Sequence, residues 1–522
     1  MKKILLFILV LTFAFTLASC DFLINIGNQT EESESSTLVS ETEITTKKID
    51  EVGSQTTITT SSVETTTEIT TTFTSTNTET FTETNSSTIS TDTTNLNEPF
   101  IPSGYSLLQD ELVDIGIPSI GDSKVLVFVV DFPDDLIVDK TAALQDTILA
   151  FNGTSEDLTY ESLKSYYQIS SFNQLNITAD VFGVYTAEYD SSYYEQANED
   201  FYAYDEVTGE YLYPEAPHPD SDIIYELLTY YDNDINYTEY DGNNDGYIDG
   251  IYVIYNHDIS YESGSDLWWA YQYYYMYYDS FDGVSPNYYV WSGIDFFYEG
   301  EDNVNARTII HETGHMLGLE DYYDYYEYDT VNEGGLGTFM MDYTVGDHDV
   351  FSKILLGWIT PKVIDKSMTV DILPHLENGD VLLVIDEWKN TIFDEYFLIM
   401  YYTPEGLNEL DQNYMFTQEG IIIFHVSAAI DNGYNDELYY YSIFNNNNTD
   451  TEDKLINIIE ADMDEDIEKY ATVENSDLFL LGDAFGYDIY PGYTWYDDIP
   501  INLYIEIIEL NESLVTIEIY FY

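Results

Sequence analysis

The sequence predicts an α+β protein in which a twisted sheet with helices is followed by a β-sandwich-like region. Three observations support this prediction. Between residues 124 and 361, apolar runs typical of buried strands alternate with segments of helical spacing. After Pro361, short β-rich runs recur between turn residues, which is the pattern of a sandwich. Before Pro99, large apolar side chains are few beyond the first 25 residues or so. We therefore expect two folded domains, at 99–361 and 362–522.

The composition limits the classes of partner. The chain has 98 acidic and 14 basic residues and a formal net charge of −84. Such a charge repels nucleic acids and anionic membrane surfaces, so we expect neither as a binding partner. Hydrophobic residues make up 44% of the chain, which is enough for a substantial core. The 52 tyrosines are spread along the whole length, which indicates a compositional bias rather than a binding surface.

The first residues have the features of an export signal. Met1-Lys2-Lys3 is followed by an apolar run from Ile4 to Leu17, which is too short for a comfortable membrane span. The run ends in Leu17-Ala-Ser-Cys20, and Cys20 is the only cysteine of the chain. This resembles a bacterial lipoprotein signal, in which the chain is cut before the cysteine and that cysteine receives lipid chains such as palmitate. The alternative is an ordinary signal peptide cut nearby.

The lipoprotein interpretation gives residues 1–19 as the signal peptide and a mature chain anchored to the membrane at the bacterial cell surface through Cys20. Residues 20–98 are rich in Thr, Ser and Glu. They cannot bury enough apolar surface to offset the entropy lost on ordering. We expect them to form a disordered stalk that carries an extracellular folded part.

Apolar patterning predicts the elements of the folded part. In the first domain we expect strands at 124–132, 175–184 and 250–255, and helices at 142–151, 159–169, 222–231 and 304–319. In the second domain we expect strands at 381–385, 396–402, 420–426, 455–459, 501–508 and 514–521.

The helix expected at 304–319 carries the motif that predicts a chemical function. His311 and His315 are four residues apart, so on a helix their imidazoles lie on one face and can share a tetrahedral Zn²⁺. Glu312 then projects beside the metal and can take a proton from a bound water. Gly318 permits the left-handed conformation that ends a helix, which brings Asp321 round as a third ligand. This is the metzincin layout with Asp in place of the third His. The alternative is a surface helix with solvated histidines.

A Gly-rich turn follows at 334–343. It contains Met340 and Met341, and a methionine in a tight turn beneath the zinc is the second metzincin feature. The sequence does not choose between the two methionines, and either could simply pack in the core. Tyr343 stands two residues after Met341, where its hydroxyl could stabilise the oxyanion of the transition state. We therefore expect Glu312 and Tyr343 to be the catalytic residues.

Three further residues leave alternatives open. Glu333 could be the third ligand in a thermolysin-like site, but Gly318 argues against it because that plan continues the helix. His348 fits a structural or a functional role equally well. His425 lies in an apolar run, where a hydrogen-bonded core histidine is more common than a metal ligand.

The segment from Asp241 to Asp249 resembles a calcium loop. Oxygen-bearing side chains fall at loop positions 1, 3, 5 and 9, namely Asp241, Asn243, Asp245 and Asp249, with Gly at position 6 and the Tyr247 carbonyl at position 7. The Glu of position 12 is missing, because Tyr252 stands there. An Asx-rich turn without metal fits the pattern equally well, so we hold both a Ca²⁺ site and a metal-free turn open.

Residues 309–361 resemble the immune inhibitor A-type secreted bacterial zinc metalloproteases, and weaker similarity covers most of residues 100–430. Glu320 stands where that family usually has Pro. The resemblance implies a zinc endopeptidase domain at 99–361 that acts on protein or peptide substrates, followed by a β-rich domain at 362–522. A catalytically inactive protease-fold lipoprotein used for binding or adhesion is the alternative. The matching residues are His311-Glu-x-x-His315-x-x-Gly318-Leu-x-Asp321-x-Tyr323-Asp324, Gly335 to Phe339, Met341-Asp-Tyr343, Val345 to His348, Ser352-Lys353 and Leu356 to Pro361.

Overall fold

A computed structural model describes Pro99 and residues 116–522, apart from 206–209, 214–215, 260–266, 299–302, 325–334, 410–413, 431–443, 449–452, 465, 468–471, 492 and 498. The expected signal peptide, Cys20 and the expected stalk lie outside the described residues, as does Glu333. The chain divides into two compact units, and every described residue belongs to the one that contains residues 96–522. In the described part, no helix combines the length and the apolar character needed to cross a membrane.

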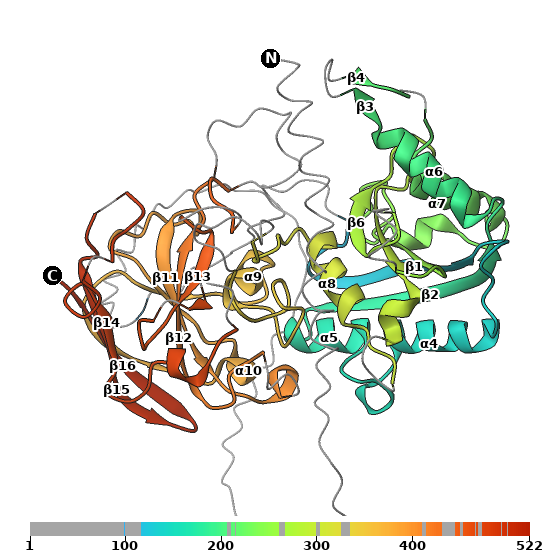
Figure 1. The fold of residues 1–522 in the computed structure, drawn as a ribbon. Coiled ribbons are helices and arrows are strands. Elements are labelled where there is room, and N and C mark those ends of the chain that lie inside the picture. The colour runs from blue at the N-terminus through green and yellow to red at the C-terminus, as the bar shows by residue number, and fades with distance from the viewer. Residues whose placement is uncertain are drawn as a thin grey trace, which may run out of the picture. The chain divides into compact units, whose positions relative to one another are not determined.

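The first region is built on a five-stranded sheet of order β2-β1-β5-β7-β6 (Figure 1). The first four strands are mutually parallel, and β6 pairs antiparallel with β7 at the edge. The strands are β1 (Gly121–Asp131), β2 (Leu175–Thr186), β5 (Ile251–Tyr255), β6 (Tyr271–Tyr274) and β7 (Tyr288–Gly293). A small hairpin of β3 (Tyr204–Asp205) and β4 (Glu210–Tyr211) lies apart from this sheet.

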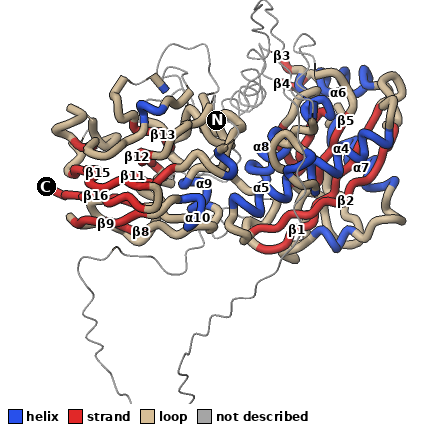
Figure 2. The backbone as a smooth tube through the Cα atoms, turned by 90° about the horizontal axis from the view of Figure 1, so that it is seen from below, coloured by secondary structure: helices blue, strands red, loops and turns tan. Residues whose placement is uncertain are grey.

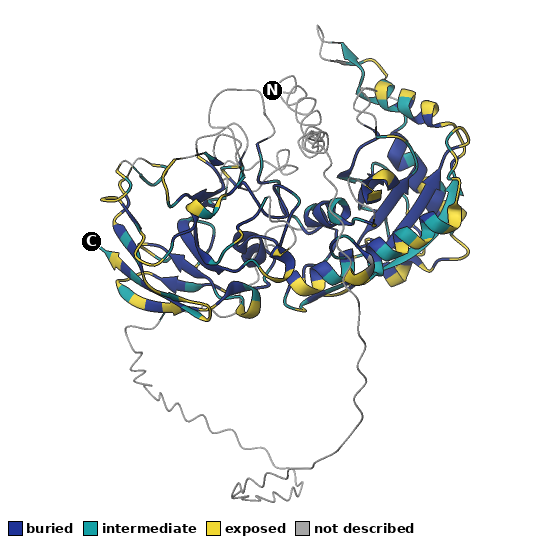
Figure 3. Cartoon of the chain, turned by 60° about the horizontal axis from the view of Figure 1, so that its bottom comes forward, coloured by how far each residue is buried: buried dark blue, intermediate teal, exposed yellow. Residues whose placement is uncertain are grey.

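Strand β1 is buried on both faces because its apolar run is continuous. Its residues Val125, Val127 and Val129 pack in a core with α4 (Lys140–Asn152), α5 (Leu163–Ser170) and α8 (Arg307–Met316). The alternate residues, such as Phe128, pack in a second core with α7 (Pro219–Tyr230) and with Tyr194 of α6 (Ser191–Tyr202). The central strands β1, β5 and β7 are therefore inside, and the outer helix faces are exposed (Figure 3).

The second region contains two sheets, of order β13-β12-β11-β10-β8 and β14-β15-β16-β9. One face of β11 and β12 shares a hydrophobic core with β15 and β16. The opposite face, including Leu398 and Phe424, belongs to the same core as α8. The strands are β8 (Lys362–Ile364), β9 (Met368–Ile372), β10 (Leu382–Val384), β11 (Glu395–Tyr402), β12 (Gly420–Ser427), β13 (Ile456–Ile459), β14 (Ala484–Gly486), β15 (Leu503–Asn511) and β16 (Leu514–Phe521).

Helices α9 (Val350–Leu355) and α10 (His375–Asn378) lie with α5 and α8 between the two groups of strands (Figure 2). Both α9 and α10 pack against β11. The two regions that the sequence predicts are thus joined by a common hydrophobic core rather than by a linker.

The structure confirms a mixed α/β protein with a β-rich C-terminal part. Every predicted helix and strand is present, with ends that shift by a few residues. Helix α5 starts later than predicted because Ser162 caps it, with its side chain accepting the Ser165 backbone N–H at 3.1 Å. Three groups of elements were not predicted: the helices α6, α9 and α10, the strand β7 and the edge strand β6 of the first sheet, and the short strands β3, β4, β8, β9 and β14.

Candidate metal centre

Helix α8 carries the two histidines on its buried end. The hydroxyl of Tyr167 donates to the Ile310 carbonyl at 2.7 Å, and the Tyr252 hydroxyl lies 2.8 Å from that of Thr313. The helix ends at Met316, earlier than predicted, because the chain turns at Gly318, whose φ is +91°. A glycine is needed at this angle, since a β-carbon would strain the backbone. The turn reverses the chain directly below the imidazoles.

The reversal brings Asp321 to both histidines. Asp321 Oδ1 lies 3.0 Å from His311 Nε2 and 3.3 Å from His315 Nε2. Ligand bonds of about 2.0 Å to a tetrahedral Zn²⁺ place neighbouring ligand atoms about 3.3 Å apart, so these spacings fit one ion. The three side chains form one of two groups of His, Cys, Asp or Glu that could hold a metal in the described part of the chain. The structure therefore brings together the three predicted zinc ligands.

The histidines are oriented through their other ring nitrogen. His311 Nδ1 lies 2.8 Å from the Met340 carbonyl oxygen, and His315 Nδ1 lies 2.9 Å from that of Leu319. A carbonyl can only accept, so each Nδ1 donates its proton there, and each Nε2 faces Asp321, where it can bind a metal after losing any proton of its own. This second shell is the arrangement expected around a metal-binding histidine.

Burial and charge shift the ionisation of the site. Burial raises the pKa of Glu312, although the charges of His311 and His315 act against this rise. Burial would lower the pKa of His315, but the charge and hydrogen bond of Asp321 outweigh it and raise that pKa to about 10. Burial likewise opposes the ionisation of Asp321, yet the two histidines hold its pKa well below the usual range. Glu312 is 4% exposed, and the Gln272 backbone of β6 hydrogen-bonds to it.

The Gly-rich turn lies against α8 beside His311, and the contacts distinguish its two methionines. Met341 packs its thioether against Gly314, between the two histidines of α8. Met340 instead contributes its carbonyl to His311. Met341 is therefore the methionine beneath the site. Tyr343 is buried and its ring stacks on Tyr414 with centroids 6.0 Å apart, and burial raises its pKa. These contacts do not bring its hydroxyl to the ligands, so its oxyanion role stays a prediction.

The loop at 241–249 folds as a series of Asx turns. The carboxylate of Asp241 accepts the N–H groups of Asp245 and Gly246 at 3.0 and 3.1 Å, and Asn243 donates to Asp245 at 2.7 Å. Asp249 is buried and accepts from Gly242 at 3.1 Å, and burial raises its pKa to about 7. Tyr247 is partly exposed. These hydrogen bonds are expected for both interpretations of the loop, and both remain open.

The two further histidines whose roles the sequence left open, His425 and His348, are both buried. His425 is fully buried, with Nδ1 3.0 Å from the Tyr493 hydroxyl and Nε2 2.9 Å from Glu395, which confirms a hydrogen-bonded core residue. His348 packs among the rings of Tyr166, Tyr167 and Trp358. Burial lowers its pKa well below the usual value, so it is neutral.

Sequence analysis missed a second carboxylate group, formed by Glu460, Asp464, Asp466 and Asp477. Asp464 and Asp466 alternate with Asp462 in the sequence, but Glu460 and Asp477 follow no such spacing, and acidic residues are abundant throughout this chain. A scan against protein-family models gives no match, and a search of curated proteins finds no similar protein.

Proposed function

We propose that this protein is a zinc-dependent endopeptidase with a metzincin-like catalytic region and a β-sandwich-like C-terminal region. One observation carries the proposal: Asp321 Oδ1 lies within 3.3 Å of the Nε2 atoms of His311 and His315, beside a buried Glu312. Two imidazoles and one carboxylate are a donor set typical of catalytic zinc, which keeps a fourth position open, and a bound metal displaces any proton from the imidazole Nε2 atoms.

Bound zinc would lower the pKa of a water molecule and polarise the carbonyl of the bond to be cut. Glu312 takes the proton of the attacking water and returns it to the leaving amine. Tyr343 is the proposed donor to the oxyanion.

The sheet edge supports a peptide as the substrate. Strand β6 ends the order of the first sheet, and the backbone of its Gln272 contacts Glu312. An extended peptide that pairs with an edge strand gains main-chain hydrogen bonds. A peptide bound along β6 would therefore pass next to Glu312.

The decisive test replaces the proposed base. Glu312→Ala should retain stoichiometric zinc and lose casein hydrolysis, whereas Glu377→Ala, at an exposed acid of α10, should match wild type in both. A zinc chelator should abolish wild-type hydrolysis, and added zinc should restore it. Cleavage of casein by Glu312→Ala at the wild-type rate would overturn the mechanism. Stoichiometric zinc without chelator-sensitive hydrolysis in wild type would instead indicate a binding or adhesion protein.

The same proposal includes the location and the second cation. We propose lipid attachment at Cys20 and a position at the bacterial cell surface, which a labelled palmitate analogue tests: Cys20→Ala should lose the label and leave the membrane fraction.

For the loop at 241–249, Ca²⁺ should raise the melting temperature of wild type but not of Asp241→Ala if the loop binds the ion. Equal responses of the two proteins would favour the metal-free turn.

A further inference from the structure

The third metal ligand is held in place by the residue that follows it. Tyr322 donates its N–H to the Met341 carbonyl at 2.8 Å, and its hydroxyl lies 3.0 Å from that of Ser352. Its own carbonyl accepts the Leu336 N–H at 3.0 Å and the side-chain amide of Asn448 at 2.9 Å. These hydrogen bonds fix the backbone on the C-terminal side of Asp321, and with it the direction of that carboxylate.

Asn448 comes from the β-rich region, 126 residues further along the chain. It is 1% exposed, and its amide is bound on both sides. Its Nδ2 donates to the Ile456 carbonyl at 2.8 Å, and its Oδ1 accepts the Ile456 N–H at 3.1 Å. Ile456 is the first residue of β13. The amide of Asn448 therefore connects a strand of the C-terminal sheet directly to the segment that carries Asp321.

A second connection reaches His311. The carbonyl of Met340, which orients His311, belongs to a turn in which the Met340 N–H donates to the Asp347 carbonyl at 3.2 Å. The Asp347 N–H in turn donates to the side-chain oxygen of Asn408 at 3.1 Å. Asn408 belongs to the short 3₁₀ turn Gly406–Asn408 of the C-terminal region and is 2% exposed.

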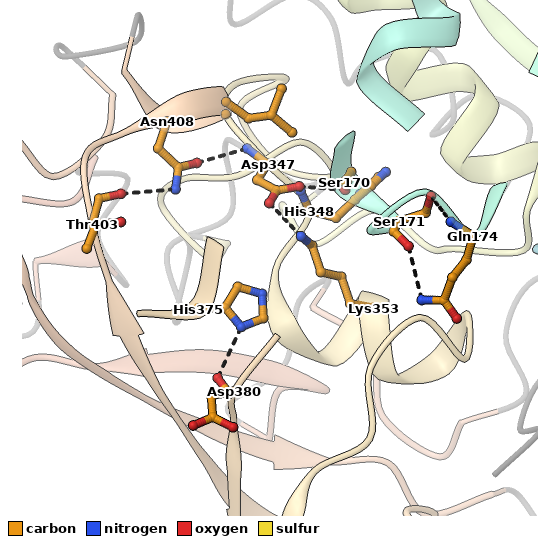
Figure 4. Close-up of polar contacts among 12 residues, drawn as sticks. Ser170, Ser171, Gln174, Asp347, His348, Lys353, His375, Asp380, Thr403 and Asn408 are labelled. Carbon is orange, nitrogen blue, oxygen red and sulfur yellow. Dashed lines mark hydrogen bonds and ion pairs between the residues drawn. The ribbon is translucent and has the colours of Figure 1, made fainter. Parts of the chain in front are cut away.

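Asp347 is anchored by charge as well (Figure 4). Its carboxylate accepts from Lys353 Nζ and from the Ser170 hydroxyl, both at 2.5 Å, and Lys353 is 1% exposed. Nearby, the Tyr160 hydroxyl lies 2.9 Å from the carbonyls of both Gly346 and Leu407 and so bridges the two regions. A buried ion pair leaves its partners little freedom, because either charge alone would be costly.

We propose that the C-terminal β-rich region completes the metal centre, with Asn448 positioning Asp321 and Asn408 positioning the turn that orients His311. Neither asparagine touches the metal or the substrate, so both are positioning residues. This inference rests on the proposed function, since it assumes that the three ligands bind zinc. Loss of partners beyond the ligands typically weakens a metal site about 10- to 100-fold.

The test measures the zinc affinity of the purified full-length protein by competition with a chromogenic chelator. Asn448→Ala should bind zinc at least about 10-fold more weakly than wild type. Asn446→Ala is the matched control, because it removes an asparagine amide from the same loop. The Asn446 amide donates to the Ser427 hydroxyl at 3.0 Å rather than to the segment that carries Asp321. The control should bind zinc within about two-fold of wild type. The visible absorption of the cobalt(II)-substituted protein should change in Asn448→Ala and not in the control.

Wild-type affinity in a folded Asn448→Ala protein would overturn the inference. Should Asn448→Ala fail to fold by circular dichroism, Asn408→Ala decides in its place: weakened zinc binding supports the inference, and unchanged binding overturns it. A wild-type protein that binds no zinc would refute the proposed function itself. The two failures are therefore distinguished by the wild-type measurement.

Discussion

Gly314 lies directly against Met341. A β-carbon built on Gly314 would come 2.9 Å from the Met341 Cε and closer still to its sulfur, and 3.5 Å from the His348 ring. The glycine therefore allows the methionine to approach the helix between His311 and His315. This contact also explains why a poor helix former occupies the last turn of α8.

Gly314→Ala should disturb the metal site although alanine is the better helix former. Overpacking typically costs about 1–3 kcal/mol, and here the methyl group would push Met341 away from the histidines. We expect a lower melting temperature and weaker zinc binding, both measured on purified protein. Neither Gly293 nor Gly283 offers a matched glycine control. A β-carbon at Gly293 would also be tightly packed, and at Gly283 it would have space but would strain a backbone of positive φ. The double variant Gly314→Ala/Met341→Ala should recover part of the lost zinc affinity, and no recovery would contradict the steric explanation.

The proximity of the three proposed ligands could be predicted from the sequence because the information that brings them together is local. His311, His315 and Asp321 lie within one helix end and one turn, and the spacing of a helix together with Gly318 places them. The positioning residues could not be predicted in this way. Asn448 and Asn408 depend on contacts across 126 and 61 residues of sequence, and a single asparagine in a loop carries no pattern.

The missed elements have a similar explanation. The strand β6 is a run of Tyr and Gln without clear alternation, so the tyrosine bias of the chain hides it. Helix α6 is rich in polar residues and buries only Ser191, Tyr194 and Ala197, which gives a weak apolar pattern. Long continuous runs such as β1 were predictable because burial on both faces demands apolar residues throughout.

Tyr343→Phe tests the predicted oxyanion donor. Removal of one such donor lowers kcat by about 100-fold or more in well-studied enzymes and changes KM much less. The ring packing on Tyr414 should survive, since phenylalanine keeps the same aromatic face. We expect unchanged zinc content and a reduced kcat on a peptide substrate. A kcat equal to that of wild type would show that the Tyr343 hydroxyl serves another purpose.

The identity of the third ligand separates the metzincin-like plan from the thermolysin-like one. Asp321→Ala should lose zinc during dialysis, because two histidines alone form a weak site. Glu333→Ala should retain stoichiometric zinc. Zinc content measured by atomic absorption on both variants decides the question, and the reverse pattern would assign the role to Glu333.

The buried His375 should make the protein less stable in mild acid. Its Nδ1 lies 3.2 Å from the Asp380 carbonyl, so the neutral ring donates there. Burial, with a further contribution from Lys353, lowers the pKa of His375 to about 3. In the unfolded chain this pKa is about 6.5. Between these values only the unfolded chain takes up the proton, so the stability contributed by His375 is complete above about pH 6.5 and decreases as the pH falls towards 3.

His375→Asn removes this titration and keeps an amide that can donate to the Asp380 carbonyl. We expect wild type to be the more stable protein at pH 7, because asparagine fills the buried site poorly. From pH 7 to pH 5 the advantage of wild type over His375→Asn in the free energy of unfolding should shrink by about 2 kcal/mol. The reason is that pH 5 lies about 1.5 units below the unfolded pKa of about 6.5, and each unit is worth about 1.4 kcal/mol. Urea unfolding at the two pH values, with a chelator present in every sample, measures this difference. The contribution of His348 is the same in both proteins and cancels in the difference. A difference between the two proteins that does not change with pH would show that His375 takes up a proton equally in the folded and unfolded states.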